Sequence, residues 1–169
     1  MRWVVGHFAA IAAVAMWVSA GVAGPAATPE REAATAQLLA LHQEVIDAHL
    51  AGNVAGILDR ESEDYVVANR GEVTFPTLAE RRQRLGPFLS RTRFDGYRDL
   101  VQPVVQVSPD GALGWVIAQI EATGVQENGD GTSEKIRYVS AWIELYERRD
   151  GRWYRVGNVS NFRPDAAAQ

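Results

Sequence analysis

The chain has no cysteine, and lysine is nearly absent, since Lys135 stands beside 16 arginines. Without cysteine the protein can form no disulfide, use no thiol nucleophile and carry no lipid on a thiol. The sequence also lacks a glycine-rich phosphate loop, a zinc-type ligand spacing and any internal repeat. These absences exclude thiol enzymes, disulfide scaffolds and P-loop proteins, and we expect no cofactor and no metal site.

The composition is typical of one globular domain. The chain has 169 residues, of which 47% are hydrophobic and 22% charged, and its net charge is −4. A short basic cluster of Arg81, Arg82 and Arg84 adjoins Glu80, a pattern that indicates a solvated helix face rather than a nucleic-acid surface. We therefore expect no nucleic-acid partner.

The first 24 residues predict a signal peptide. Arg2 supplies a positive start, residues 3–18 are almost wholly apolar, and small residues follow up to residue 23. Cleavage there would make the protein periplasmic or secreted and leave no stable membrane span. The alternative is an uncleaved anchor, but roughly 16–18 apolar residues are fewer than the roughly 20 that cross a bilayer. We divide the remainder into a tether and helix start at 25–35, a folded domain at 36–164 and a disordered tail at 165–169.

A long amphipathic helix is predicted at the start of the domain. Thr28-Pro29 favours its beginning and Gly52-Asn53 its end near Ala51. At 100° per residue, His42 and His49 fall in the middle of the apolar stripe, about 10.5 Å apart along the axis. That separation argues against one metal ion bound by both. The stripe consists of Leu38, Leu39, Leu41, Val45, Ile46 and Leu50.

Shorter elements are predicted next. Asn53 can cap a second helix, and Thr77 with Glu80 forms a capping box that opens a third, in which Gly86-Pro87 is expected to cause a kink or an interruption. Between these helices, β-branched and aromatic residues predict a strand that turns at Arg70-Gly71. The predicted ranges are 54–60 for the second helix, 64–69 for the strand, a return through Val73 and Phe75, and 77–90 for the third helix.

Long strand-like runs fill the C-terminal part of the chain. Asp110-Gly111 and Asp150-Gly151 are strong turn signals, because both residue types tolerate the positive φ of a tight turn. Strands of 10–15 residues exceed the usual length of about 5–6 and imply a curved sheet. We predict an α+β fold with the helices on one face of a curved antiparallel sheet and a pocket in its hollow. The predicted strands are residues 100–108, 112–126, 134–149 and 152–162.

The final hairpin carries a family resemblance. Residues 141–153, followed by Val156 and Ser160, resemble the last hairpin of the NTF2-like superfamily, in particular its SnoaL-like, DUF4440-type branch. The turn at 108–111 and Trp115 are also similar to that branch, and the resemblance covers roughly residues 36–164. It implies a cone-shaped, cystatin-like fold, in which a curved sheet wraps the N-terminal helix beside two further short helices. It also implies a cavity at the wide end and a homodimer formed through the sheet. Activity does not follow, because this superfamily hosts enzymes and binding modules alike.

The two helix histidines are the first candidate site residues. A neutral buried imidazole can act as a general base or as a hydrogen-bonding group for a ligand. The alternative is a histidine that only satisfies its own hydrogen bonds in the core. We take His42 and His49 as candidate catalytic and ligand-binding residues, and His49, nearer the helix end, as the better candidate for lining the pocket.

The last strand supplies the second group. Asn158 and Ser160 are polar residues of an otherwise apolar strand, as expected for a small-molecule pocket, although exposure at a fraying strand is the alternative. With a two-residue turn they share a face with Ile143 and Ala141, and a shift of one residue would pair them with Glu144 and Trp142 instead. The remaining candidates are Tyr65 and Trp142.

Three functions are compatible with these patterns, and the sequence leaves open whether the protein is an enzyme. The first is an exported module that binds an apolar or aromatic small molecule. The second is a SnoaL-like isomerase, cyclase or dehydratase that uses a pocket histidine as general base. The resemblance places Asn69 where ketosteroid isomerase-like members have their proton-shuttling aspartate, and an amide cannot take that role. The third is a dimerising module that uses an outer sheet face with Trp115, Gln119 and Glu121.

Overall fold

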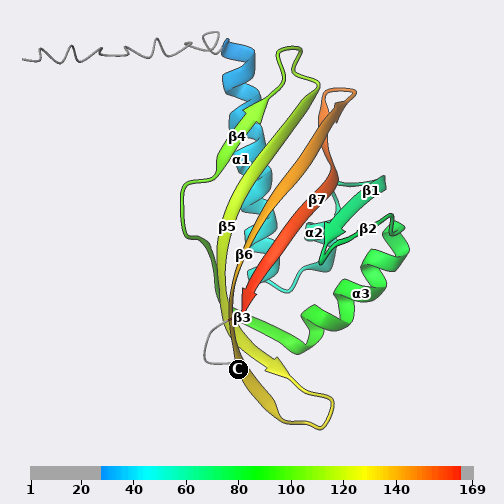
Figure 1. The fold of residues 1–169 in the computed structure, drawn as a ribbon, viewed down its shortest axis with the longest axis vertical. Coiled ribbons are helices and arrows are strands. Elements are labelled where there is room, and N and C mark those ends of the chain that lie inside the picture. Colours follow the sequence, from blue (N-terminus) through cyan, green and yellow to red (C-terminus); the bar gives the residue numbers. More distant parts are fainter. Residues whose placement is uncertain (1–27, 165–169) are drawn as a thin grey trace, which may run out of the picture.

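The computed structural model describes residues 28–164, with helices on one side of a seven-stranded curved sheet (Figure 1). The predicted signal peptide, the start of the tether and the tail at 165–169 lie outside the described residues. The helices are α1 (Pro29–Leu50), α2 (Val54–Leu58) and α3 (Leu78–Arg91). The strands are β1 (Glu61–Asn69), β2 (Glu72–Thr74), β3 (Thr92–Asp99), β4 (Val104–Val107), β5 (Leu113–Glu127), β6 (Ser133–Arg149) and β7 (Arg152–Pro164).

The helix ends follow the capping residues in the sequence. The Thr28 hydroxyl accepts a hydrogen bond from the backbone N–H of Arg31, Pro29 occupies the first turn, and Gly52 follows α1 with a φ of +62°. Asn53 caps α2, and the capping box of Thr77 and Glu80 opens α3. The predicted helices are thus present, and α3 continues through Pro87 to Arg91.

The sheet order is β2-β1-β7-β6-β5-β3, with β4 also paired to β5. The sheet is mixed, because β1 runs parallel to β7 while every other pair is antiparallel. The prediction of a purely antiparallel sheet was therefore wrong at this edge. The curved, unclosed sheet and the helix in its hollow agree with the predicted α+β cone.

One edge of β5 differs from the prediction. The sequence predicted a strand over residues 100–108, but only Val104–Val107 forms β4, and Leu100 and Val101 are exposed. The unpredicted strand β3 occupies Thr92–Asp99 and pairs with residues 120–126 of β5. Its register shifts between Phe94 and Gly96, so a bulge bends the strand there.

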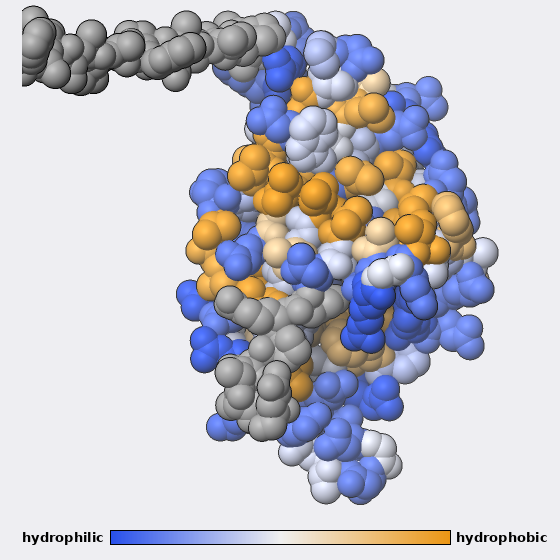
Figure 2. All heavy atoms as spheres, in the orientation of Figure 1, coloured by the Kyte–Doolittle hydropathy of each residue, from blue (hydrophilic) through white to orange (hydrophobic). Residues whose placement is uncertain are grey.

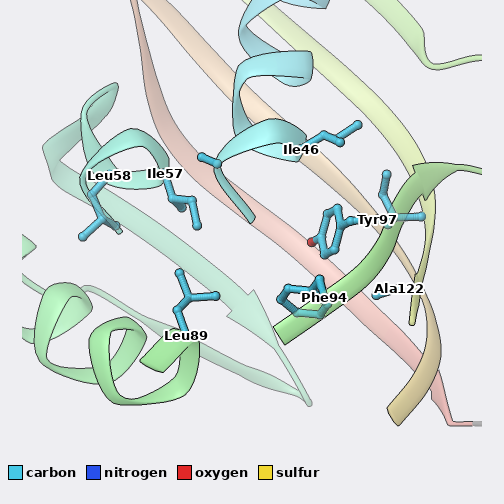
Figure 3. Packing of buried hydrophobic residues seen from close by; sticks show 9 residues of the cluster. Ile46, Ile57, Leu58, Leu89, Phe94, Tyr97 and Ala122 are labelled. Carbon is cyan, nitrogen blue, oxygen red and sulfur yellow. The ribbon is translucent and has the colours of Figure 1, made fainter. Parts of the chain in front are cut away.

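Two apolar clusters fix the helices to the hollow of the sheet. Near the start of α1, Leu38 packs with Val116, Tyr146 and Trp153. Near its end, Ile46 packs with residues of α2, α3 and β3, as Figure 3 shows. The labelled members of this second cluster are Ile46, Ile57, Leu58, Leu89, Phe94, Tyr97 and Ala122. As predicted, the face of β5 bearing Val116, Ala118, Ile120 and Ala122 is buried core.

The opposite face of the sheet carries exposed apolar side chains. Trp115 lies opposite Leu145, and Ile117 lies opposite both Val104 and Ile143. Figure 2 shows apolar residues gathered on the face drawn toward the viewer. We use the name outer sheet face for six of these residues, all at least 37% exposed: Val104, Leu113, Trp115, Ile117, Leu145 and Val159. Glu121 was expected on solvent or at an interface, but only 8% of it is exposed, because Arg98 and Arg137 bind it at 2.7 Å and 2.6 Å.

Candidate functional site

A cavity of about 410 Å³ lies between the second half of α1, helices α2 and α3, and the inner face of β6 and β7. We call it the inner cavity. Its volume lies within the range of about 300–1,000 Å³ that small-molecule sites usually have. Its wall combines five aromatic side chains with seven polar ones. The aromatic members are Tyr65, Phe88, Tyr97, Tyr138 and Trp142, and the polar ones are His49, Glu61, Ser140, Glu144, Arg155, Asn158 and Ser160.

Five of the six predicted ligand-binding residues meet in this wall. They come from three distant segments: His49 from α1, Tyr65 from β1, and Trp142, Asn158 and Ser160 from the last hairpin. His42 is elsewhere. It lies behind the wall, only 2% exposed, with Nδ1 directed at Glu144.

The register of the last hairpin brings the polar residues into the wall. The Asp150-Gly151 turn has two residues, so Arg149 pairs with Arg152 and Tyr146 with Arg155. The register then shifts by one, and Asn158 pairs with Glu144 and Ser160 with Trp142. The second of the two predicted pairings is therefore the correct one, but the shift comes from a bulge at Val156 and not from a longer turn. Because of this bulge, Arg155 shares the inner face with Asn158.

His49 lines the inner cavity in a fixed tautomer. Its Nδ1 donates a hydrogen bond to the carbonyl of Val45 at 2.7 Å, which leaves the lone pair on Nε2. The ring is stacked on Tyr97, with centroids 4.4 Å apart, and meets the edge of Phe94. Burial lowers the pKa of His49 to about 4 despite the hydrogen bond to Val45. At neutral pH, His49 is therefore an uncharged hydrogen-bond acceptor.

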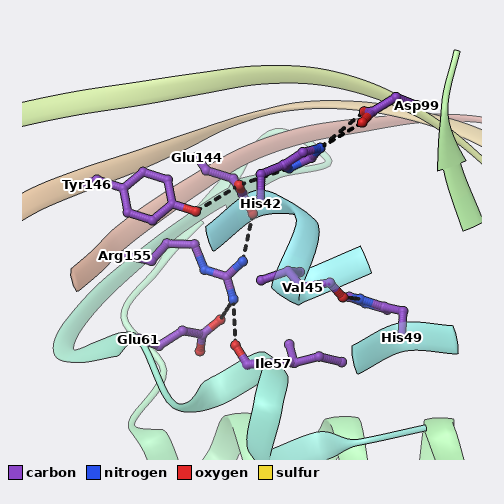
Figure 4. Close-up of polar contacts among 9 residues, drawn as sticks. All are labelled: His42, Val45, His49, Ile57, Glu61, Asp99, Glu144, Tyr146 and Arg155. Carbon is purple, nitrogen blue, oxygen red and sulfur yellow. Dashed lines mark hydrogen bonds and ion pairs between the residues drawn. The ribbon is translucent and has the colours of Figure 1, made fainter. Parts of the chain in front are cut away.

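His42 lies between two carboxylates, as Figure 4 shows. Its Nε2 is 3.1 Å from Asp99 Oδ1, and its Nδ1 is 3.5 Å from Glu144 Oε2. Burial acts to lower the pKa of His42, but Glu144 and then Asp99 outweigh it and raise the pKa above its ordinary value. The imidazole thus joins α1 to β3 through a hydrogen bond to Asp99 and to β6 through an ion pair with Glu144.

A buried charge network forms the floor of the inner cavity. The guanidinium of Arg155 donates to Glu144 at 2.6 Å, and to Glu61 and the carbonyl of Ile57 at 2.8 Å (Figure 4). Glu61 also pairs with Arg81 Nε at 2.7 Å. Burial acts to raise the pKa of Glu144, but Arg155 and then His42 lower it to about 2. Glu144 is therefore ionised throughout the physiological range.

The predicted site residues include none of the four members of this network, Glu61, Arg81, Glu144 and Arg155. The acidic stretch around Glu61 and the basic cluster around Arg81 were both interpreted as solvated, yet each side chain is no more than 6% exposed. The available signal lay in the strand pattern. Arg155 alternates with Trp153, and Glu144 lies between Trp142 and Tyr146, so each charge occupies a strand position on the same face as aromatic residues.

Several polar groups of the inner cavity have unused hydrogen-bonding capacity. Within residues 28–164, the indole N–H of Trp142 is buried without a partner. The side chains of Asn158, Ser160 and Tyr65 likewise make no hydrogen bond to side chains that the structure describes. These groups, with Nε2 of His49, offer donors and acceptors to a ligand, since buried polar groups are normally satisfied.

Three further observations concern the described residues. In the described part of the chain, no three His, Asp or Glu side chains converge in a way that could hold a metal ion. Over the same residues, no helix is both long enough and apolar enough to cross a membrane. Asn69 lies at the end of β1, opposite Glu72 on one side and Ser160 on the other.

Comparison with solved structures identifies the fold. A ketosteroid isomerase-like protein from Erwinia carotovora superposes with a TM-score of 0.58 at 14% identity, over 76% of this chain and 95% of the other. An NTF2-like protein from Cytophaga hutchinsonii gives 0.59 at 12%, over 75% and 95%. The association domain of CaMKII from C. elegans gives 0.56 at 12%, over 79% and 99%. The chain therefore has the NTF2-like fold, a cystatin-like cone.

Sequence comparison adds no nearer relative, because no family profile and no curated protein matches the chain. At identities of 11–18%, the structural relatives define the fold and not the activity.

Proposed function

We propose that this protein binds an apolar or aromatic small molecule in the inner cavity. The observation that carries the proposal is that five predicted ligand-binding residues, distant in sequence, line one hollow of about 410 Å³. Aromatic side chains supply stacking surface for a planar ligand. Asn158, Ser160 and Nε2 of His49 would fix its orientation by hydrogen bonds.

A thermal-shift screen with hydrophobic aromatic compounds tests this function. Ser160→Trp fills the inner cavity and should abolish stabilisation by any hit. Val159→Trp is the matched control, because Val159 is the neighbouring residue on the outer sheet face, 45% exposed. Equal responses of the two variants and the wild type would show that the compounds bind elsewhere.

A second candidate function is enzymatic. The fixed tautomer of His49 leaves Nε2 free to take a proton from a bound substrate, with Asn158 or Tyr65 stabilising an oxyanion, as in a SnoaL-like isomerase, cyclase or dehydratase. A pKa of about 4 makes this nitrogen a weak base, so only an acidified C–H group would react. NMR detection of deuterium uptake into enolisable ketones tests the idea. Uptake that is lost in His49→Gln supports catalysis, and no uptake with the wild type rejects it.

We also propose that the protein forms a homodimer through the outer sheet face. Its exposed apolar side chains are contiguous across four strands, a pattern that often marks an association surface. Sedimentation of the wild type should give a dimer, and Ile117→Arg should shift it to monomer. A wild-type protein that sediments only as a monomer would contradict this part.

Export is likewise proposed from the sequence of residues 1–24. The ligand would then be met in the periplasm or outside the cell. Mass spectrometry of protein expressed with its natural N-terminus should show cleavage near residue 23. A mature chain that retains Met1 or Arg2 would point to the uncleaved anchor.

A further inference from the structure

The inner cavity continues into a second hollow. This outer lobe has a volume of about 260 Å³ and lies between β1 and α3. It shares five wall residues with the inner cavity, so the two hollows adjoin: Ile57, Glu61, Tyr65, Phe88 and Asn158. The residues that line only the outer lobe are Leu58, Val67, Arg81, Arg84 and Leu85. A ligand seated in the inner cavity can therefore extend toward α3.

The charges of the inner cavity are already paired. The terminal nitrogens of Arg155 are bound to Glu144, Glu61 and a backbone carbonyl. Arg81, which lines the outer lobe and not the inner cavity, is similarly occupied, because it binds Glu61 and the carbonyls of Pro76 and Ser62. An anionic group brought into this cavity would lose its hydration and meet two carboxylates, with no free cation to compensate it. The inner cavity is thus suited to the uncharged part of a ligand.

The outer lobe has one cation in excess, because Glu61 in its wall is paired with Arg81 and Arg84 remains. Arg84 is exposed and makes no hydrogen bond or ion pair with the side chains that the structure describes. Glu80, one helical turn before Arg84 and in electrostatic interaction with it, is held in the capping box by Thr77. The guanidinium of Arg84 is therefore available, and its planar donors suit carboxylate, sulfonate or phosphate groups.

We infer that the ligand is an amphipathic anion, whose apolar or aromatic body fills the inner cavity while its acidic group remains at the outer lobe beside Arg84. This inference rests on the proposed binding function and adds a direction to it. Arg84 then selects for an acidic group, and the paired charges at the floor reject the reverse orientation.

Two fluorescent probes with one skeleton test this inference. N-phenyl-1-naphthylamine is neutral, and 8-anilinonaphthalene-1-sulfonate carries an added sulfonate. In titrations of the full chain, Arg84→Gln should weaken binding of the sulfonate probe about threefold to fivefold and leave the neutral probe within about twofold. Raising the salt from about 0.05 to about 0.5 M should weaken binding of the sulfonate probe to the wild type but not to the variant.

Matched variants separate the outcomes. Arg82→Gln removes a neighbouring exposed charge of α3 that lies outside both hollows, and should change neither titration. Ser160→Trp should abolish binding of both probes. If Ser160→Trp abolishes binding but Arg84→Gln affects neither probe, or both equally, the inference is wrong while the cavity function stands. If the wild type binds neither probe, the proposed function itself is contradicted.

Discussion

Nδ1 of His42 lies 3.5 Å from Oε2 of Glu144, while Nε2 of the same ring lies 3.1 Å from Asp99. One side chain of α1 thus contacts both a carboxylate in the cavity wall and one at the end of β3. Glu144 is held in turn by Arg155 and by the hydroxyl of Tyr146 at 3.0 Å. The inner cavity is therefore built on a charge network whose stability depends on every member being paired.

Arg155→Met should be strongly destabilising. The variant leaves Glu144 and Glu61 buried with fewer partners, and breaking a buried pair in this way costs about 3–5 kcal/mol. Urea denaturation at neutral pH measures the change. Arg149→Met is the control, because Arg149 binds Glu147 and Asp64 at the surface and should have little effect. Equal losses in the two variants would show that the network is not a special source of stability.

His49 should make the fold less stable in acid. Its pKa in the folded protein, about 4, is below the ordinary value of 6.5, so the unfolded chain takes up a proton before the folded one. Stability should therefore fall as pH decreases from about 6.5 to about 4, by up to about 3 kcal/mol. Unfolding free energies of wild type and His49→Gln at several pH values test this. A wild-type slope that persists unchanged in His49→Gln would assign it to other groups.

His42 should act in the opposite direction. Glu144 and Asp99 raise its pKa in the folded protein, so the folded chain keeps its proton longer than the unfolded one. The resulting stabilisation is complete below about pH 6.5 and is lost as pH rises through the folded pKa. NMR titration of the imidazole should give a midpoint above 6.5, and His42→Gln should remove the alkaline slope of stability. A midpoint below 6.5 would mean that burial, not the carboxylates, controls this residue.

Gly124 should be intolerant of a side chain. At this position β5 passes so close to β3 that a Cβ would overlap the backbone carbonyl of Arg93. Gly124→Ala should therefore force the strands apart and destabilise the fold by about 1–3 kcal/mol. Gly129→Ala is the matched control, because a Cβ there meets open space in the loop between β5 and β6. Similar melting temperatures for both variants would contradict the close approach of these strands.

Much of this fold could be predicted from local signals. Helix caps and tight turns depend on contacts within a few residues, so they can be predicted directly from the sequence. Examples are the caps at Thr28, Asn53 and Thr77 and the Asp150-Gly151 turn. Strand β3 was missed because it contains Asp95-Gly96, a pair usual in turns, which here lies at a bulge. The apolar pair Leu100-Val101 suggested a strand, but here the N–H of Leu100 donates to the carbonyl of Gln119 in β5, both side chains are exposed, and β4 begins only at Val104.

The site was predictable only in part, for a related reason. Asn158 and Ser160 could be assigned to a pocket as polar residues of an apolar strand, whereas the sequence left open whether Ala141 or Trp142 faces Ser160. The charge network could not, because Glu61, Arg81 and Arg155 come from three separate elements and become buried only when these elements meet. The bulge at Val156 could not be predicted either, and it determines which side chains share the inner face with Asn158.

The most direct test of ligand binding in the inner cavity uses the tryptophan indole signals in an NMR titration with N-phenyl-1-naphthylamine. Trp142 has a buried indole N–H without a partner among residues 28–164, whereas Trp153 donates to Gln37 and Trp115 lies on the outer sheet face. We expect the Trp142 signal, assigned with Trp142→Phe, to shift in a saturable manner while the Trp115 signal stays in place. Movement of Trp115 alone, or of no indole signal, would contradict binding in the inner cavity.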